Sequence, residues 1–319
     1  MQDSLSISNS RIMTTKYRSL IIKVVVFLAV LAGIDFVVGK AYRSLEHKAL
    51  AHSPYGMVTE YTMWEVHSDV VIIGASEAQH SYIPSVLEEK LGLSVYNCGK
   101  DGCRFYYQNA MINGILDRYT PKMLIWSISP DELSTPSEQD KGKLSELNPF
   151  YKSNKYCKEV LKTKSDFELL KLKSNCYLYN SKLFQYLYCC YYPDYQYEKG
   201  YAPLYGNQKG LEIKTKTWND NYDETIDNVF SNTLQRCVQN NVQIVLVYTP
   251  RLETGDYSVL ESQQHLRSTI NNVGVLLIDD LYHNDSLMLP EYFKDNAHLN
   301  HEGAALFTGM LAEKIVSAK

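Results

Sequence analysis

The stretch that decides the fold is VVIIGASEAQHSYIP, residues 70–84. It opens with an apolar run that predicts a buried strand, and Gly74-Ala75-Ser76 ends this run abruptly. A small-residue turn with one hydroxyl after a strand either presents a nucleophile or only turns the chain. A serine alone is a poor nucleophile, because it needs a base, a group that orients the base, and donors for an oxyanion. The role of Ser76 therefore depends on the rest of the chain.

Strands and helices alternate along most of the sequence. We expect strands at residues 70–73, 94–96, 122–129, 242–248 and 275–278, and helices at 83–91, 105–118, 222–240, 258–272 and 304–316. Continuous apolar strands that alternate with helices predict a parallel sheet covered on both faces. The fold class is therefore α/β, a three-layer flavodoxin-like sandwich with about five parallel strands. Active residues in such folds gather at the carboxyl ends of the strands.

An apolar segment near the N-terminus, LIIKVVVFLAVLAGIDFVVG at residues 20–39, is long enough to cross a bilayer. Lys23 and Asp35 lie near its ends, where charged side chains can reach the headgroups. The segment has no convincing small-x-small cleavage site, which favours an uncleaved signal anchor. Basic residues precede it, so the N-terminus is expected to stay in the cytoplasm.

These features predict the domain organisation. We expect a cytoplasmic tail at residues 1–19, a transmembrane anchor at 20–39, a juxtamembrane linker at 40–68 and the main domain at 69–319. The protein would then be a single-pass membrane protein, with its main domain on the periplasmic or extracellular side. The anchor is also expected to pack against nothing else in the chain.

The alternation stops between residues 134 and 217, and this segment is rich in tyrosine, of which the chain has 26. It is too long to be a loop without structure of its own, so we expect an inserted cap. Its tyrosines either form platforms for sugar rings or fill a small helical subdomain. The sequence leaves both alternatives open.

The composition of the chain limits the kinds of partner and cofactor that we expect. The formal net charge of −4 argues against a nucleic-acid partner. The seven cysteines match no zinc-binding pattern, and an odd number leaves at least one free or paired between chains. Cys98 and Cys103 are close enough in sequence to form a disulfide in an oxidising compartment, which the spacing leaves undecided. We expect neither a metal nor another cofactor.

A second polar constellation lies near the C-terminus, in DNAHLNHEGA at residues 295–304. Asp295 and His298 are three residues apart, so the carboxylate can meet Nδ1 of the imidazole and leave Nε2 free to take a proton. The loop after the last strand of a doubly wound sheet can lie beside the loop after the first, which would bring His298 to Ser76. The backbone N–H groups of Ser76 and Gly99 are the candidate oxyanion donors, since a glycine lets an oxyanion approach closely.

These motifs resemble the SGNH hydrolases, also called GDSL esterases. Gly74-Ala75-Ser76 is similar to the family's first block, with alanine in place of the usual aspartate. The segment from Asn97 to Gly102 resembles the second block, and Asp295-Asn296-Ala297-His298 the last. The resemblance covers residues 70–129 and 242–316. It implies that Ser76 is the nucleophile, His298 the base and Asp295 the group that orients the base.

The third block departs from the family, because SISPDEL at residues 127–133 has no asparagine. In this respect the chain looks more like the membrane-anchored branch that serves alginate acetylation and teichoic-acid D-alanylation. Losing one oxyanion donor costs a few kcal/mol of transition-state stabilisation unless another group replaces it. Arg104, Ser129 and Arg251 are the candidates for this replacement, and Asn97 is expected to shape the loop beside them.

The resemblance implies a serine esterase or O-acyltransferase that acts through an acyl-enzyme on acyl esters, mainly acetyl esters, of a cell-envelope carbohydrate. It also implies a membrane-bound acyltransferase as a partner. The alternative is an inactive SGNH-like module that binds glycan or scaffolds such a system. An α/β-hydrolase fits poorly, because its serine lies in G-x-S-x-G midway along the chain. Taken alone, Ser76 could simply cap a helix.

Overall fold

The centre of the molecule is a parallel sheet of five strands. The structure is a computed structural model that describes residues 2–180, 182–192, 197–218 and 221–318, with side chains from residue 17. The order across the sheet is β2-β1-β3-β5-β7. The strands are β1 (Val70–Ile73), β2 (Val95–Asn97), β3 (Met123–Ile128), β5 (Gln243–Tyr248) and β7 (Leu276–Ile278). Two short parallel strands, β4 (Lys214–Thr215) and β6 (Glu253–Thr254), form a separate sheet. The predicted α/β fold with five parallel strands is confirmed.

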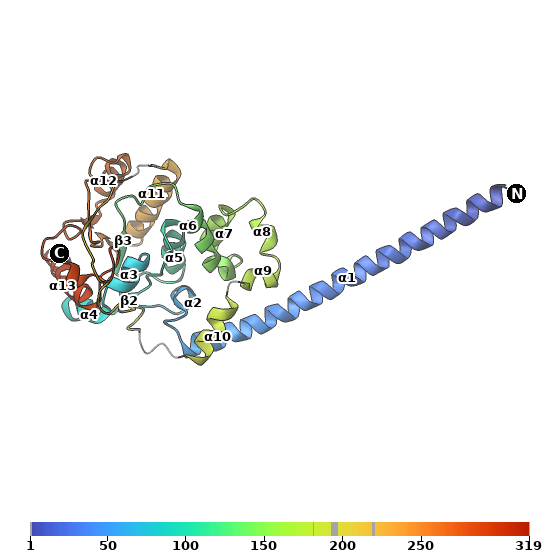
Figure 1. The fold of residues 1–319 in the computed structure, drawn as a ribbon, viewed down its shortest axis with the longest axis horizontal. Coiled ribbons are helices and arrows are strands. Elements are labelled where there is room, and N and C mark those ends of the chain that lie inside the picture. Colours follow the sequence, from blue (N-terminus) through green and yellow to red (C-terminus); the bar gives the residue numbers. More distant parts are fainter. Residues whose placement is uncertain (1, 181, 193–196, 219–220, 319) are drawn as a thin grey trace.

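Helices cover both faces of the large sheet (Figure 1). The helices and 3-10 turns are α1 (Gln2–His52), α2 (Val58–Trp64), α3 (Ser76–Ser81), α4 (Pro84–Leu91), α5 (Phe105–Arg118), α6 (Glu138–Lys143), η1 (Leu144–Phe150), α7 (Lys155–Lys162), α8 (Glu168–Lys171), α9 (Asn175–Tyr179), α10 (Leu183–Tyr191), α11 (Glu224–Gln239), α12 (Glu261–Val273), η2 (Pro290–Tyr292) and α13 (His301–Ser317). Helices α2, α5, α11 and α12 bury side chains on one face, and α3, α4 and α13 on the other.

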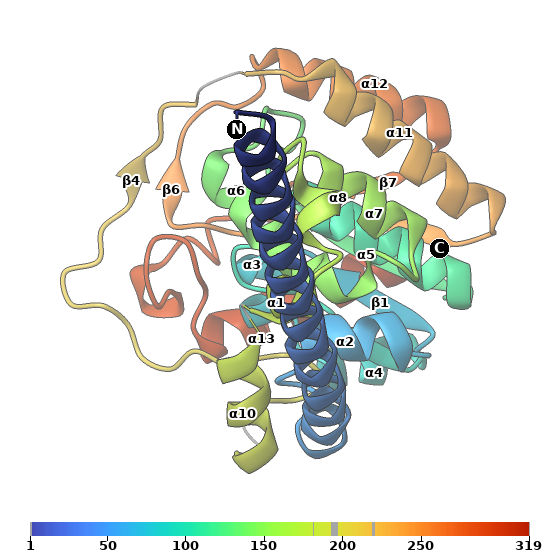
Figure 2. The same ribbon diagram turned by 90° about the vertical axis from the view of Figure 1, so that its right-hand side faces the viewer.

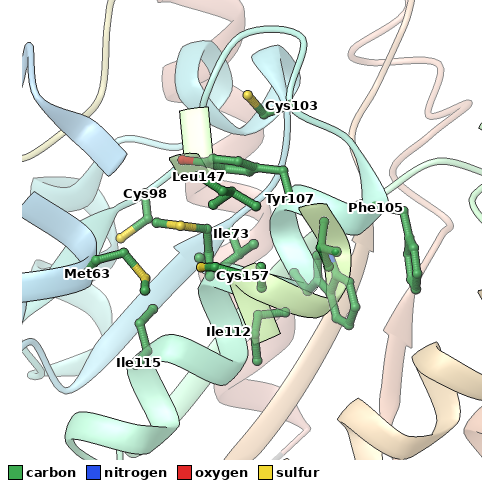
Figure 3. Packing of buried hydrophobic residues seen from close by; sticks show 14 of the residues in the cluster. Met63, Ile73, Cys98, Cys103, Phe105, Tyr107, Ile112, Ile115, Leu147 and Cys157 are labelled. Carbon is green, nitrogen blue, oxygen red and sulfur yellow. The ribbon is translucent and has the colours of Figure 1, made fainter. Parts of the chain in front are cut away.

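Strand β1 shows why the sheet is buried on both sides. Val71 and Ile73 belong to the core cluster under α5, whereas Val70 and Ile72 point into the cluster under α13. Successive side chains of a strand point to opposite faces, so a run of four apolar residues feeds both layers. Figure 3 shows the first cluster, where side chains from α2, α5, η1 and α7 meet beneath β1.

Most predicted elements are present, with shifted ends. The helix predicted at 105–118 has those bounds, and the one predicted at 304–316 starts three residues earlier, at His301. This earlier start follows from Asn300, whose side chain accepts a hydrogen bond from the N–H of Gly303 and so caps α13. Helix α3, which begins at Ser76, was not predicted.

The predicted linker at 40–68 is wrong, because this stretch belongs to the folded domain. Helix α1 continues to His52, and one stripe of it faces the protein at helical spacing, including Asp35, Gly39, Tyr42, Glu46 and Ala49. Four buried apolar residues of the following segment, Met57, Val58, Met63 and Val66, join α2 to the cores. The stripe is hidden in sequence because it lies within one continuous helix.

The apolar N-terminal segment is part of α1, and the part of the chain that the structure describes has one helix long and apolar enough to span a membrane, Tyr17–His52. The expectation that this anchor packs against nothing is wrong at its end. Asp35 accepts hydrogen bonds from Ser174 and from the N–H groups of Asn175 and Cys176 at the start of α9. A carboxylate at a helix N-terminus satisfies N–H groups that have no partner within the helix.

The predicted cap, residues 134–217, contains α6–α10, η1 and β4, while its residues 181 and 193–196 lie outside the described ones. Helices α9 and α10 pack against α1, and α7 packs against α5 (Figure 1). Tyr179 stacks on Tyr42 of α1, and Tyr186 is fully buried between α10 and α1. These two tyrosines fill the subdomain, whereas other tyrosines of the same segment, Tyr188, Tyr191, Tyr192 and Tyr205, are exposed.

The cysteines form no disulfide. Each of the seven is a reduced thiol, and Cys176 is the exposed one. Cys98 and Cys103 are buried in the core cluster at separate places (Figure 3). Burial raises the pKa of both thiols to about 12, which keeps them protonated and unreactive near neutral pH.

Candidate active site

Ser76 lies at the carboxyl end of β1, as the first residue of α3. The residue that caps this helix is Ala75, and no side chain makes the cap hydrogen bond. The alternative in which Ser76 only caps a helix is therefore wrong. Its hydroxyl instead lies 2.8 Å from Nε2 of His298, a residue 222 positions further along the chain.

The loop that carries His298 is held at both of its ends. Phe293 and Leu299 form an isolated antiparallel bridge, and the N–H of Lys294 donates to the carbonyl of His298. Asn300 then caps α13 immediately afterwards. Asn296 is held as well, because its carbonyl accepts from the N–H of Leu252 and its side-chain amide donates to the carbonyls of Leu252 and Glu212, so the segments beside β6 and β4 help to place the imidazole.

Asp295 and His298 contact each other through Nδ1. The Nδ1 atom lies 2.9 Å from Oδ1 and 3.0 Å from Oδ2 of the carboxylate, and Oδ1 also accepts from the N–H groups of Ala297 and His298. Burial raises the pKa of Asp295, but these hydrogen bonds outweigh it and keep the pKa below its usual value. An ionised carboxylate can only accept, so Nδ1 carries the proton and Nε2 is left to accept from Ser76.

Gly99, the second predicted oxyanion donor, does not face the site. Its N–H donates to Oδ1 of Asn97 at 2.9 Å, so this donor is already used. A Cβ at Gly99 would come within 2.5 Å of the backbone nitrogen of Gln79, so this glycine lets the loop pack against α3. The expected oxyanion role of Gly99 is not supported, for this geometric reason.

Asn97 is a structural residue rather than a pocket residue. It is fully buried, and its side-chain amide donates to the carbonyls of Ala78 and Tyr82 at 2.7 and 2.9 Å. Together with the bond to Gly99, these contacts tie the loop after β2 to α3. The predicted shaping role in this loop agrees with these contacts, whereas a pocket role does not.

Gly102, further along the same loop, does line the cavity that holds Ser76. It has a φ of +68°, and its N–H makes no hydrogen bond to any residue that the structure describes. The N–H of Ser76 is equally unused, because the first N–H groups of a helix have no partner within it. The segment 97–102 contains two glycines, and the sequence alone favours the first, Gly99, as the oxyanion donor rather than the second, Gly102.

The cavity at Ser76 has a volume of about 260 Å³ and polar walls. All three candidates for the missing asparagine, Arg104, Ser129 and Arg251, line it. Arg104 is committed to Ser129 at 2.9 Å and to Asp131 at 3.3 Å, and Ser129 donates to Glu132. These bonds leave Arg104 and Ser129 with fewer free donors toward Ser76.

Arg251 lines the same cavity and is held there by carboxylates. Its NH1 group donates to Glu77 at 2.6 Å, and Glu77 also lies 3.2 Å from the Ser76 hydroxyl. Its Nε atom is buried and makes no hydrogen bond among the described residues, although Glu253 lies 3.3 Å away. The ion pairs with Glu77 and Glu253 therefore fix the guanidinium in the cavity that Ser76 lines.

A second cavity, about 510 Å³, adjoins the first and shares Gly102, Arg104 and Asp131 with it. Segments at and before α6 and after β4 form its outer wall, whereas α7–α10 contribute to neither cavity. Three of its polar atoms are buried without a hydrogen bond among the described residues. They are Oε1 of Glu132, Oγ of Ser134 and Nε1 of Trp218.

Two further histidines, His80 and His301, lie near the catalytic candidates in the sequence, and the structure places the His80 ring beside that of His298. His80 bonds through Nδ1 to the carbonyl of Ala202 at 2.7 Å and through Nε2 to Asp101 at 2.9 Å. Both partners can only accept hydrogen bonds, so His80 carries a proton on each ring nitrogen. The pKa of His80 agrees with this, because burial lowers it but the two acceptors hold it above its usual value. The His80 ring stands edge-on to that of His298, with centroids 5.7 Å apart. His301 contacts Tyr201 instead.

No protein-family model matches the chain, and no curated protein matches it either. Among solved structures, the chain is similar to a protein described as a lipolytic protein of the G-D-S-L family from Desulfitobacterium hafniense DCB-2, at 12% identity and a TM-score of 0.39, over 77% of this chain and 98% of the other. It is also similar to a protein described as an acylhydrolase from Bacteroides fragilis NCTC 9343, at 10% identity and a TM-score of 0.37, over 78% and 86% of the two chains. At these values neither likeness identifies the chemistry of this chain.

Proposed function

We propose that the protein is a serine ester hydrolase or O-acyltransferase in which Ser76 is the nucleophile, His298 the general base and Asp295 the residue that orients it. The observation that carries the proposal is the continuous chain from the Ser76 hydroxyl through both nitrogens of His298 to the Asp295 carboxylate. A nucleophile, a base in reach of it and a third group that fixes the tautomer are the parts that acyl transfer requires.

The reaction follows from these positions. Ser76 Oγ attacks the ester carbonyl while its proton passes to Nε2 of His298, and the carbonyl oxygen becomes an oxyanion. The C–O bond of the ester then breaks, and the same proton goes to the departing alcohol. Water, or another hydroxyl, then attacks the acyl-serine and gives its proton to His298. The bond between the acyl carbon and Ser76 Oγ breaks, His298 returns the proton to Oγ, and the acid or the new ester leaves.

The oxyanion needs donors, and we propose the N–H groups of Ser76 and Gly102 in place of that of Gly99. Both lie on the wall of one cavity and have no other acceptor among the described residues. Arg251, which lines the cavity and is held in place by Glu77, is the proposed replacement for the missing asparagine. A donor held in place before the reaction costs no reorganisation when charge develops.

The substrate proposal is a short acyl ester, chiefly acetyl, of a cell-envelope carbohydrate. A long acyl chain would have to displace water from the polar walls of the inner cavity without replacing its hydrogen bonds, which favours a short acyl group. The outer cavity, at about 510 Å³, has room for the alcohol part. Polar side chains in its lining, such as Gln139, Asp140 and Lys216, suit a group rich in hydroxyls.

The proposed location of the protein in the cell membrane supports the same substrate class. We propose that the apolar part of α1 anchors the protein in the cell membrane and that residues after it lie on the periplasmic or extracellular side. A membrane-bound acyltransferase that loads the acyl group is the proposed partner. The proposed orientation of the chain across the membrane rests on the basic residues that precede the apolar segment.

The variant Ser76→Ala tests the proposal. Hydrolysis of p-nitrophenyl acetate and labelling by a fluorophosphonate probe should both be lost, with a rate reduction of roughly a thousandfold or more. The free energy of unfolding should change by less than about 1 kcal/mol, because Ser76 is half-buried and does not cap α3. Ser81→Ala, in the same helix, is the matched control. An enzyme that is neither labelled nor active before mutation would favour the inactive module instead.

A further inference from the structure

The turn that contains α8 exposes two apolar side chains and buries a carboxylate between them, while Leu169 and Leu172 pack into the core. Phe167, which precedes it, and Leu170 are 68% and 61% exposed, whereas the carboxylate-bearing Glu168 between them is 1% exposed. In a protein surrounded by water the apolar side chains of such a turn face inward. These exposed side chains therefore suit an apolar environment better than water.

This arrangement is held in place by ionic contacts. Glu168 lies 3.0 Å from Lys164 and 2.5 Å from Lys171, and it accepts a hydrogen bond from the Tyr177 hydroxyl at 2.9 Å. Burial raises the pKa of Glu168, but the contacts with Lys171, Lys164 and Tyr177 outweigh burial and lower this pKa to about 2. Because Glu168 occupies the inward position, Phe167 and Leu170 cannot turn into the protein without breaking these contacts.

The position of α8 relative to α1 identifies the apolar phase. Three residues after α8 ends, Asp35 of α1 accepts hydrogen bonds from Ser174, Asn175 and Cys176. Asp35 is four residues before the end of the apolar run at Gly39, a rise of about 6 Å along the helix. Before Asp35, the described side chains of α1 are exposed on every side.

The views agree with this placement. In Figure 1, α8 and α9 lie beside α1 on the side of the domain from which the helix projects. Figure 2 looks at that side, with α1 pointing toward the viewer and α8 near it. A bilayer that surrounds the apolar part of α1 thus ends at the level of the segment 164–176.

We infer that residues 164–176 are a membrane-resting foot, in which Phe167 and Leu170 enter the interface of the same bilayer that α1 spans. The foot carries the exposed Lys171 and Lys173, which suit the phosphate groups of lipids. A helix and a second contact on the same bilayer fix the tilt of the domain, and therefore the distance of the Ser76 cavity from the membrane. The inference rests on the proposed anchoring of α1 and is independent of the proposed catalysis.

The test uses the full-length protein in lipid nanodiscs, with the exposed Cys176 replaced by serine and an environment-sensitive fluorophore attached at single new cysteines. The positions are Phe167→Cys in the foot, Phe27→Cys in the apolar part of α1, and Val259→Cys as the matched control. Val259 is 70% exposed and precedes α12, on a different side of the domain from α8. The remaining six cysteines are buried and should not react.

We expect the labels at 167 and 27 to emit at shorter wavelength than the label at 259 and to be quenched by nitroxide-bearing lipids. The label at 259 should be quenched by aqueous iodide alone. A label at 167 that behaves like the one at 259, while position 27 contacts lipid, overturns the foot and leaves the anchor intact. A label at 27 that contacts no lipid overturns the anchor, and the foot with it.

Discussion

The substitution Asp295→Asn tests how the candidate triad works, because it keeps the shape of the side chain and removes its charge. In the structure Oδ1 of Asp295 accepts from two backbone N–H groups and from Nδ1 of His298, whereas Oδ2 meets Nδ1 alone. The asparagine oxygen should keep the backbone bonds in the Oδ1 position. Its amide would then replace Oδ2, so the ring keeps one acceptor but loses the negative charge beside it.

The size of the effect follows from that lost charge. When His298 takes the serine proton it becomes a cation, and two unit charges about 4 Å apart attract by about 4 kcal/mol at an effective dielectric constant of about 20. The Asp295 side chain is 42% exposed, so water weakens this attraction. We expect a loss of about 2–4 kcal/mol in transition-state stabilisation, or roughly 30- to 1,000-fold in kcat/KM. A deeply buried aspartate in such a triad is worth about 10⁴-fold.

The assay is steady-state hydrolysis of p-nitrophenyl acetate by Asp295→Asn, Ser76→Ala and the unmodified protein. Asp280→Asn is the control, because Asp280 is an exposed carboxylate paired with Lys314, away from the cavities. Asp295→Asn should fall between the control and Ser76→Ala. Activity within twofold of the control would refute the orienting role of Asp295, and a loss equal to that of Ser76→Ala would refute the argument from exposure.

Two further predictions concern the loop beside the site. Gly99→Ala should lower the free energy of unfolding by about 1–3 kcal/mol, because the added Cβ would meet the backbone of α3. Chemical denaturation measures this change, and an unchanged stability would contradict the close packing of Gly99 against α3. His80→Gln should destabilise the protein mainly at low pH. Because the folded-state pKa of His80 is raised above about 6.5, its stabilising contribution is complete below that pH and is lost as the pH rises through the folded-state value. The difference in unfolding free energy between the two proteins should therefore shrink from pH 6 upward, and a difference that grows with pH would show that His80 is not the doubly protonated group.

Local patterns in the sequence were enough to predict the sheet and the Asp295–His298 pair. Strands β1, β3 and β5 are continuous apolar runs, and such runs are stable only when helices cover both faces, so they predict a buried parallel sheet. The pair is equally local, because a spacing of three residues lets one short loop bring a carboxylate to Nδ1. Neither prediction needs to know which distant residues are neighbours.

The tertiary structure decided the features that depend on distant contacts. Whether Gly99 or Gly102 has a free N–H depends on where the Asn97 side chain points, and both glycines look alike in the sequence. The use of Arg251 depends on Glu77, 174 residues away.

The same reason applies to the N-terminal helix and the tyrosine-rich segment. The sequence by itself determined that residues 20–39 are apolar enough to leave water, but the partners of Asp35 lie about 140 residues further on, in α9. Similarly, the segment around Phe167 looks like an ordinary polar turn until Glu168 is seen to be buried by Lys164, Lys171 and Tyr177. Periodicity along one chain reports which side chains avoid water, whereas the packing of separate elements decides what they face instead.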